Sequence, residues 1–259
     1  MASVIVEEIS DVNELLLLAA ENGSLQGVKT VLKAGADIEF DRVYSEFSSS
    51  GTALNIACAL GHVDIVKLLL RKGASVVKRA RASLVPLHVA AAEGWIEVVE
   101  LLVQHGATLD VQDGFQNTPL MYACVNGQVD TVRQLIELGA RPDLTGFLAV
   151  RLGKANGNCG VAGCDEGIKL IQEAKETKLL RCCNPKCGKP GYRSTLKLCA
   201  GCKLTRYCGR DCQKQHWSVG HKKCCGQDAF TDEGPVTFQE VFTKLMADEI
   251  REQEHMKQA

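Results

Sequence analysis

The sequence predicts a mainly α-helical protein: a solenoid of paired helices, a small cysteine-rich metal module and a C-terminal helix. Gly-Ala pairs recur at nearly constant spacing through the first 140 residues, and apolar residues between them follow helical spacing. Nine of the thirteen cysteines lie between Cys182 and Cys225. One helix pair is too small to bury its own apolar face, so we expect successive pairs to stack.

The repeats are defined by two series of glycines. The Gly-Ala pairs are separated by steps of 38, 33 and 33 residues and begin at Gly35, Gly73, Gly106 and Gly139. The second series keeps the same steps, at Gly23, Gly61, Gly94 and Gly127. Three segments open the first helix of a repeat: Thr52-Ala-Leu-Asn55, Val85-Pro-Leu-His88 and Thr118-Pro-Leu-Met121. Proline suits the first helical turn, and glycine after a helix accepts the left-handed conformation.

A 33-residue period with these motifs resembles the ankyrin family over residues 11–175. The resemblance implies helix-turn-helix repeats with β-hairpin fingers and a groove that binds another protein. We expect repeats at about 11–40, 48–80, 82–112 and 115–145, then a degenerate cap over 146–175 with helical segments at 147–152 and 168–171. The longer first step places an insertion at 40–51, which we interpret as a tolerated surface loop.

Individual residues of the repeats are given structural roles. We expect His88 to bond backbone between repeats, and Cys58 and Cys124 to be small buried apolar residues. His62 and His105 are predicted to be exposed. We interpret the remaining pair, Cys159 and Cys164, as loop cysteines rather than metal ligands. No catalytic triad, phosphate-binding loop or carboxylate pair is evident in the repeats.

The cysteine-rich run has the spacing of zinc ligands. It reads Cys199-x2-Cys202-x5-Cys208-x3-Cys212-x8-His221-x3-Cys225, preceded by Cys182, Cys183 and Cys187. A structural zinc ion takes four thiolate or imidazole ligands, so eight ligands from this run hold two ions.

The amino terminus has acidic residues and no basic signal region, so we expect an intracellular protein, in the cytoplasm or nucleus, with reduced cysteines.

The pieces Arg206-Tyr-Cys208, Cys212-Gln213 and His216-Trp217 resemble the MYND zinc finger, over residues 182–225. The resemblance implies two interleaved structural Zn²⁺ sites. Site one would contain Cys182 or Cys183, with Cys187, Cys208 and Cys212; site two would contain Cys199, Cys202, His221, and Cys225 or Cys224. We favour Cys182 because of the Asn-Pro insertion after Cys183, and Cys225 because of its x3 spacing from His221. Tyr207, His216 and Trp217 are expected in the packing of the finger.

Eight ligands for two ions leave no open coordination position, so we predict structural zinc and no enzyme activity. The combination resembles ankyrin and MYND proteins, which implies an adaptor. The ankyrin groove would bind one protein partner and the finger a short proline-containing peptide. We expect a monomer without a membrane span.

Two alternatives remain for the function. One is a transcriptional cofactor that contacts nucleic acid through the finger, since twelve Lys or Arg and one acid lie between Lys178 and Lys223. The other is a component of a lysine methyltransferase or ubiquitin-ligase system.

The C-terminal helix is predicted over 236–257. Thr237 and Glu240 form a capping-box pattern at its start. Its apolar stripe consists of Phe238, Val241, Phe242, Leu245 and Met246. We expect this stripe to bind a partner, or to dock onto the finger or the last repeat.

Overall fold

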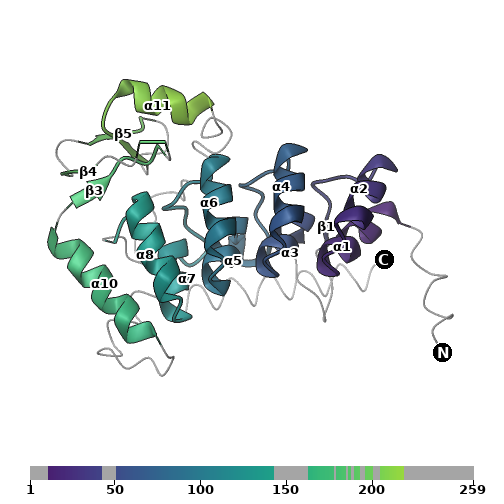
Figure 1. Ribbon diagram of the computed structural model, residues 1–259, viewed down its shortest axis with the longest axis horizontal. Helices are drawn as coiled ribbons and strands as arrows, with labels where there is room; N and C mark the ends of the chain where they lie inside the picture. Colours follow the sequence, from purple (N-terminus) through teal and green to yellow (C-terminus); the bar gives the residue numbers. More distant parts are fainter. Residues whose placement is uncertain are drawn as a thin grey trace.

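The structure is a computed structural model, which describes residues 11–42, 51–142, 163–177, 179–184, 186–187, 190–192, 196–200 and 205–218. Helix pairs stand in a row, and the cysteine-rich module follows α10 at the far end of the row (Figure 1). The predicted helices at 147–152 and 236–257 lie outside these residues. Within the described ranges, no helix combines the length and apolar composition that a membrane crossing needs.

Eight of the described helices form four pairs. They are α1 (Val12–Glu21) with α2 (Leu25–Lys33), α3 (Ala53–Ala59) with α4 (Val63–Arg71), α5 (Pro86–Glu93) with α6 (Ile96–Gln104), and α7 (Pro119–Val125) with α8 (Val129–Leu138). Local sequence sets their starts: Thr52 and Asn55 form a capping box on α3, and Pro86 and Pro119 open α5 and α7. Helices of two or three turns are marginal alone, so packing must hold them.

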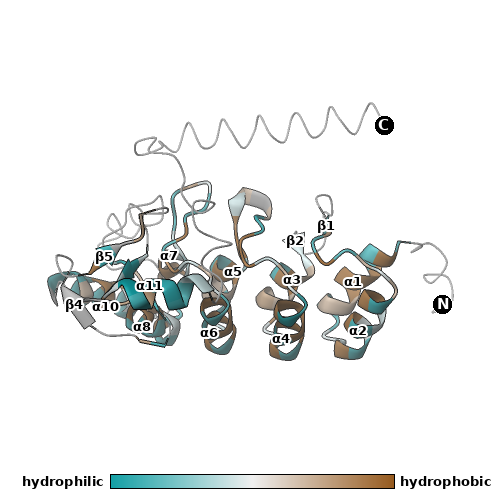
Figure 2. Ribbon diagram, turned by 90° about the horizontal axis from the view of Figure 1, so that it is seen from above, coloured by the Kyte–Doolittle hydropathy of each residue, from teal (hydrophilic) through white to brown (hydrophobic). Residues whose placement is uncertain are grey.

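The core runs through the row as one continuous cluster. The first helix of each pair contributes fully or almost fully buried side chains, namely Leu16, Ile56, Leu87 and Leu120. The second helices supply Val28, Ile65, Val98 and Val132 to the same cluster. Figure 2 shows apolar residues along these helices, with polar residues on their outer surfaces. Each pair therefore buries its apolar face against its neighbours, as a solenoid requires.

Fingers connect the pairs on the side opposite the second helices (Figure 2). In the first finger, β1 (Asp41–Arg42) pairs antiparallel with β2 (Gly51–Thr52), and the insertion at 43–50 is outside the described residues. The second finger contains a short 3-10 helix, η1 (Arg81–Ser83). It contacts the third finger, because the backbone N–H of Gly114 donates to the Ala82 carbonyl at 3.0 Å.

The other end of the row is covered by α10 (Cys164–Thr177), which packs on α7 and α8 through Ile168 and Ile171. Cys164, predicted to lie in a loop, is instead the buried first residue of this helix. It is disulfide-bonded. Cys58 and Cys124 are fully buried, which confirms their predicted role.

The turn within each of the first three repeats is covered by a side chain of the next repeat. Trp95 lies over Gly61, whose φ is +70°, and its indole N–H donates to the Ala59 carbonyl at 2.9 Å. His62 lies over Gly23 and bonds the Glu21 carbonyl at 3.3 Å, and Gln128 lies over Gly94 and bonds the Ala92 carbonyl at 3.4 Å.

The prediction that His62 and His105 are exposed is wrong. Both are half-buried and bonded to backbone carbonyls.

A buried polar network lies between the second and third fingers and helix α5. The backbone N–H of Val85 donates to Nδ1 of His88 at 3.2 Å, so Nε2 carries the ring proton. Nε2 therefore donates to the carbonyls of Val111 and Asn117, at 3.2 and 3.1 Å. The prediction that His88 bonds backbone between repeats is confirmed. The residue is fully buried, and burial lowers its pKa to about 4.

Asp113 anchors the other half of this network. Its carboxylate accepts hydrogen bonds from the backbone N–H groups of Phe115 and Asn117, both at 2.8 Å, and from the Tyr122 hydroxyl at 2.6 Å. Burial and the nearby Asp113 charge raise the pKa of Tyr122. The carboxylate holds the third finger against α7, and the sequence analysis did not identify it.

Replacing Gly61 with alanine should destabilise the protein more than replacing Gly73. Both glycines have positive φ, +70° and +94°, so each alanine has a backbone cost of about 1 kcal/mol. A Cβ on residue 61 would also approach the Trp95 ring to 2.6 Å, whereas residue 73 has no atom within 4 Å. Urea unfolding of the full chain should show an additional loss of about 1 kcal/mol or more for Gly61→Ala. The difference should disappear in a Trp95→Ala background; equal losses with Trp95 present would contradict the contact.

His88 should remain neutral in the folded protein at pH 5.5. Its folded pKa is lowered from 6.5 to about 4, so the neutral ring stabilises the fold fully above pH 6.5. That contribution, about 3 kcal/mol, should be lost as the pH falls from 6.5 to 4. Long-range ¹H–¹⁵N NMR of the histidine rings should show His88 as the Nε2–H tautomer at pH 5.5. Protonation near pH 6.5 would contradict this assignment.

Candidate metal centre

In the residues that the structure describes, the cysteine-rich module contains two short hairpins and one helix. Strand β3 (Leu179–Arg181) pairs antiparallel with β4 (Pro190–Tyr192), and β5 (Lys197–Leu198) with β6 (Arg206–Tyr207). Helix α11 (Arg210–His216) follows. Two-stranded hairpins of this length are not stable alone in water, so another interaction must hold them together.

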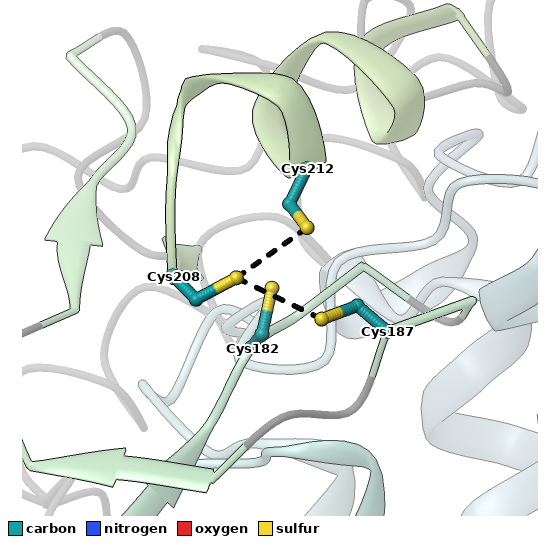
Figure 3. Close-up of side chains that lie close together, drawn as sticks. All are labelled: Cys182, Cys187, Cys208 and Cys212. Carbon is teal, nitrogen blue, oxygen red and sulfur yellow. Dashed lines mark hydrogen bonds between the residues drawn. The ribbon is translucent and has the colours of Figure 1, made fainter.

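Four thiols from these elements converge on one point (Figure 3). Cys182 follows β3, Cys187 lies between β3 and β4, Cys208 follows β6, and Cys212 projects from α11. All four sulfur atoms lie within 4.8 Å of one another. The Sγ atom of Cys208 is 3.7 Å from that of Cys187 and 3.4 Å from that of Cys212. The chain thus brings together residues about 30 positions apart.

The geometry of the four thiols fits a tetrahedral zinc ion. Zn–S bonds of about 2.3 Å in a tetrahedron place the sulfur atoms about 3.8 Å apart. The two observed separations, 3.7 and 3.4 Å, are close to that value. Four thiolate donors with no carboxylate among them form a ligand set that is typical of structural zinc.

Metal binding at this cluster must displace protons. The hydrogen bond with Cys212 raises the pKa of Cys208 to about 12, and burial raises the pKa of Cys182 to about 11. Both thiols therefore keep their protons at neutral pH until a cation replaces them. Zinc binding should release protons and weaken as the pH falls.

Cys183 lies next to the cluster but has a different environment. Its sulfur accepts a hydrogen bond from the Arg206 backbone N–H at 3.3 Å, and its own N–H donates to the Arg206 carbonyl at 2.8 Å. These two bonds join the first hairpin to β6. The thiol is buried, so it packs inside the finger.

The residues predicted for a second site are described only in part. Cys199 is buried, and its backbone N–H donates to the Thr205 carbonyl at 2.9 Å. The other candidates lie outside the described residues: Cys202, His221, Cys224 and Cys225.

Asn184 ties the first hairpin to α11, and the sequence analysis did not identify this role. Its side-chain oxygen accepts from the Lys186 backbone N–H at 3.2 Å, and its amide donates to the Gln215 side chain at 2.9 Å. The position of Asn184 between Cys183 and Cys187 was the available signal, because asparagine commonly bonds backbone two residues on.

The interior of the finger contains an aromatic pair. The Tyr207 hydroxyl and Nδ1 of His216 are hydrogen-bonded at 2.9 Å, and their rings meet edge to face at 5.8 Å. Both residues are 1% exposed, as expected for packing residues. The same expectation is wrong for Trp217, which is 39% exposed at the end of α11.

Helix α11 therefore has two different faces. Cys212 points into the thiol cluster, and His216, one turn later, is buried against Tyr207. Arg210 and Lys214 are exposed, as is Trp217. We call these last three residues the α11 stripe, since they recur at i, i+4 and i+7.

Comparison with known families finds two matches. The family model described as ankyrin repeats in three copies matches residues 4–80 and 78–145, and the MYND finger model matches residues 182–225. Both are general protein-interaction modules, and a MYND finger implies zinc.

One curated relative matches over a short segment. Ubiquitin carboxyl-terminal hydrolase 19 of Arabidopsis thaliana is 44% identical over 50 residues, which make up 19% of this chain and 7% of that protein. The match covers too little of the relative to transfer its printed activity. The ankyrin model, in contrast, matches more than half of the 259 residues. This chain therefore belongs to the ankyrin-repeat family and carries a MYND zinc finger after its repeats.

Proposed function

We propose that this protein is an adaptor in which the ankyrin array binds one protein and the zinc finger binds a short proline-containing peptide. The two faces of α11 carry this proposal. The inward face is occupied by the thiol cluster and the buried pair of Tyr207 and His216. The outward face presents a tryptophan that the finger does not bury.

An exposed indole in line with basic side chains on one helix face suits a proline-containing ligand. Proline-rich segments are preformed extended helices that lose little entropy on binding, and they dock on aromatic surfaces. Tryptophan is also among the residues that contribute most to binding energy. Arg210 and Lys214, exposed on the same helix, would favour acidic residues in the ligand.

The finger side of the array is the proposed surface for the second partner. Three non-glycine residues there have positive φ: Ala82 at 57°, Ser83 and Gln116 at 60°. Such conformations are costly and persist only when the surrounding structure enforces them, and they concentrate at binding sites. The hydrogen bonds of the second and third fingers hold these tips in place.

We assign two structural zinc ions to the finger. Site one would comprise Cys182, Cys187, Cys208 and Cys212, and site two Cys199, Cys202, His221 and Cys225. The sulfur separations support the first site, and the spacing in the sequence supports the second. The ion of site one would join the first hairpin to the end of β6 and to α11, which stabilises a module that has almost no apolar core.

Substituting single cysteines should distinguish the ligands from their neighbours. Elemental analysis of the purified full chain should find two zinc ions for the wild type and for Cys183→Ser. Cys182→Ser and Cys208→Ser should each lose one ion, because a serine hydroxyl is a poor zinc ligand. Cys183→Ser is the matched control for Cys182→Ser. Loss of zinc from the control, with zinc retained in Cys182→Ser, would reverse the assignment.

Trp217→Ala should abolish most peptide binding without releasing zinc. We expect affinity for proline-containing nine-residue peptides, selected on a peptide array, to fall about 30-fold, the loss typical of a binding hot spot. Trp95→Ala, which changes the only other tryptophan, should leave that affinity unchanged. Equal affinity of wild type and Trp217→Ala, measured by calorimetry, would refute the peptide site.

A further inference from the structure

We infer that the α11 stripe is occupied in cis by residues 228–236 of this same chain, so that a partner peptide must displace them. The inference rests on the proposed peptide-binding function. It identifies the segment that occupies the α11 stripe before a partner peptide binds.

The stripe defines the chemistry of its ligand. Arg210 and Lys214 lie one turn apart and are exposed, and Trp217 follows in the next turn. Asp211 is exposed beside Arg210 and is the one acidic residue between Lys178 and Lys223. The finger surface also exposes Lys186 and Lys197. A ligand for this surface should be acidic and should carry a group that packs flat on an indole.

The segment after the finger has this composition. Residues 228–236 read Asp-Ala-Phe-Thr-Asp-Glu-Gly-Pro-Val, with acids at Asp228, Asp232 and Glu233 and a proline at Pro235. No lysine or arginine occurs between Gly226 and Pro235. The segment is therefore complementary to the stripe both in charge and in its proline.

Pro235 is also the one proline that the two modules do not use. The chain has six prolines. Pro86 and Pro119 open helices, Pro142 is buried after α8, Pro190 begins β4, and Pro185 falls within the matched finger region of the sequence. Pro235 lies outside both matched regions, 10 residues after the finger ends at Cys225.

The connection is long enough to return to the stripe. Thirteen residues lead from Ser218, the last described residue, to Thr231, and an extended chain of that length spans about 44 Å. Helix α11 is only about 10 Å long. A short tether places the segment at an effective concentration of about 1 mM, which a second copy or a dilute partner does not reach. The cis segment is therefore the favoured occupant.

NMR of the two tryptophan indoles tests occupancy in the full chain. One variant combines Asp232→Asn, Glu233→Gln and Pro235→Ala; its control carries Asp248→Asn and Glu249→Gln, an equal charge change further along the tail. The first variant should shift the Trp217 indole resonance, assigned with Trp217→Phe, and leave that of Trp95 unchanged. The control should shift neither. An unchanged Trp217 resonance in the first variant would overturn the inference.

A second measurement separates this inference from the proposed function. The probe is a synthetic peptide of residues 228–238, titrated by calorimetry into each chain. If the cis segment competes with a dissociation constant of about 0.1 mM, the peptide should bind the first variant about tenfold more tightly than the wild type. Equal binding to both chains would refute the cis contact but leave the peptide site intact. Absence of binding, together with an unchanged Trp217 resonance, would refute both.

Discussion

Burial of apolar side chains between neighbouring helix pairs is the interaction on which the array depends. Helices of seven to ten residues do not persist alone, and each pair exposes an apolar face on both sides. Leu16, Ile56, Leu87 and Leu120 are buried because the neighbouring helices cover them. Apolar packing is not directional, whereas the hydrogen bonds of the network around His88 and Asp113 fix the orientation of one finger relative to the next.

The zinc finger follows a different physical principle. Its buried core, within the described residues, consists of Cys182, Cys183, Cys199 and Tyr207. Three of these four are cysteines, so little apolar area is available to hold strands of two or three residues. Coordination bonds would replace the missing core. The outward face of α11 exposes Arg210, Lys214 and Trp217.

Much of this organisation was visible in the sequence because it repeats or has fixed spacing. The glycine series located the helix pairs, and the cysteine spacing located the zinc-binding module. The features that the sequence did not predict depend on contacts between residues far apart in the chain, or on the direction in which a side chain points. His62 bonds a carbonyl 41 residues away, so nothing near it indicates burial. Cys182 and Cys183 are adjacent, and side chains alternate along extended backbone, so spacing alone leaves open which thiol faces Cys208. His216 and Trp217 form one motif, yet the helix turns them to opposite environments.

The covered glycine turns have a consequence for how such an array can change its length. In the first three repeats, the side chain that covers the turn belongs to the following repeat: an imidazole, an indole and an amide at His62, Trp95 and Gln128. All three bond the same position, the carbonyl two residues before the glycine. Removing or duplicating a block of 33 residues would bring a glycine under a different one of these groups. Three chemically distinct side chains therefore fill the same structural position over a glycine turn. Recombination between repeats can therefore preserve the joint while exchanging the surface on either side of it.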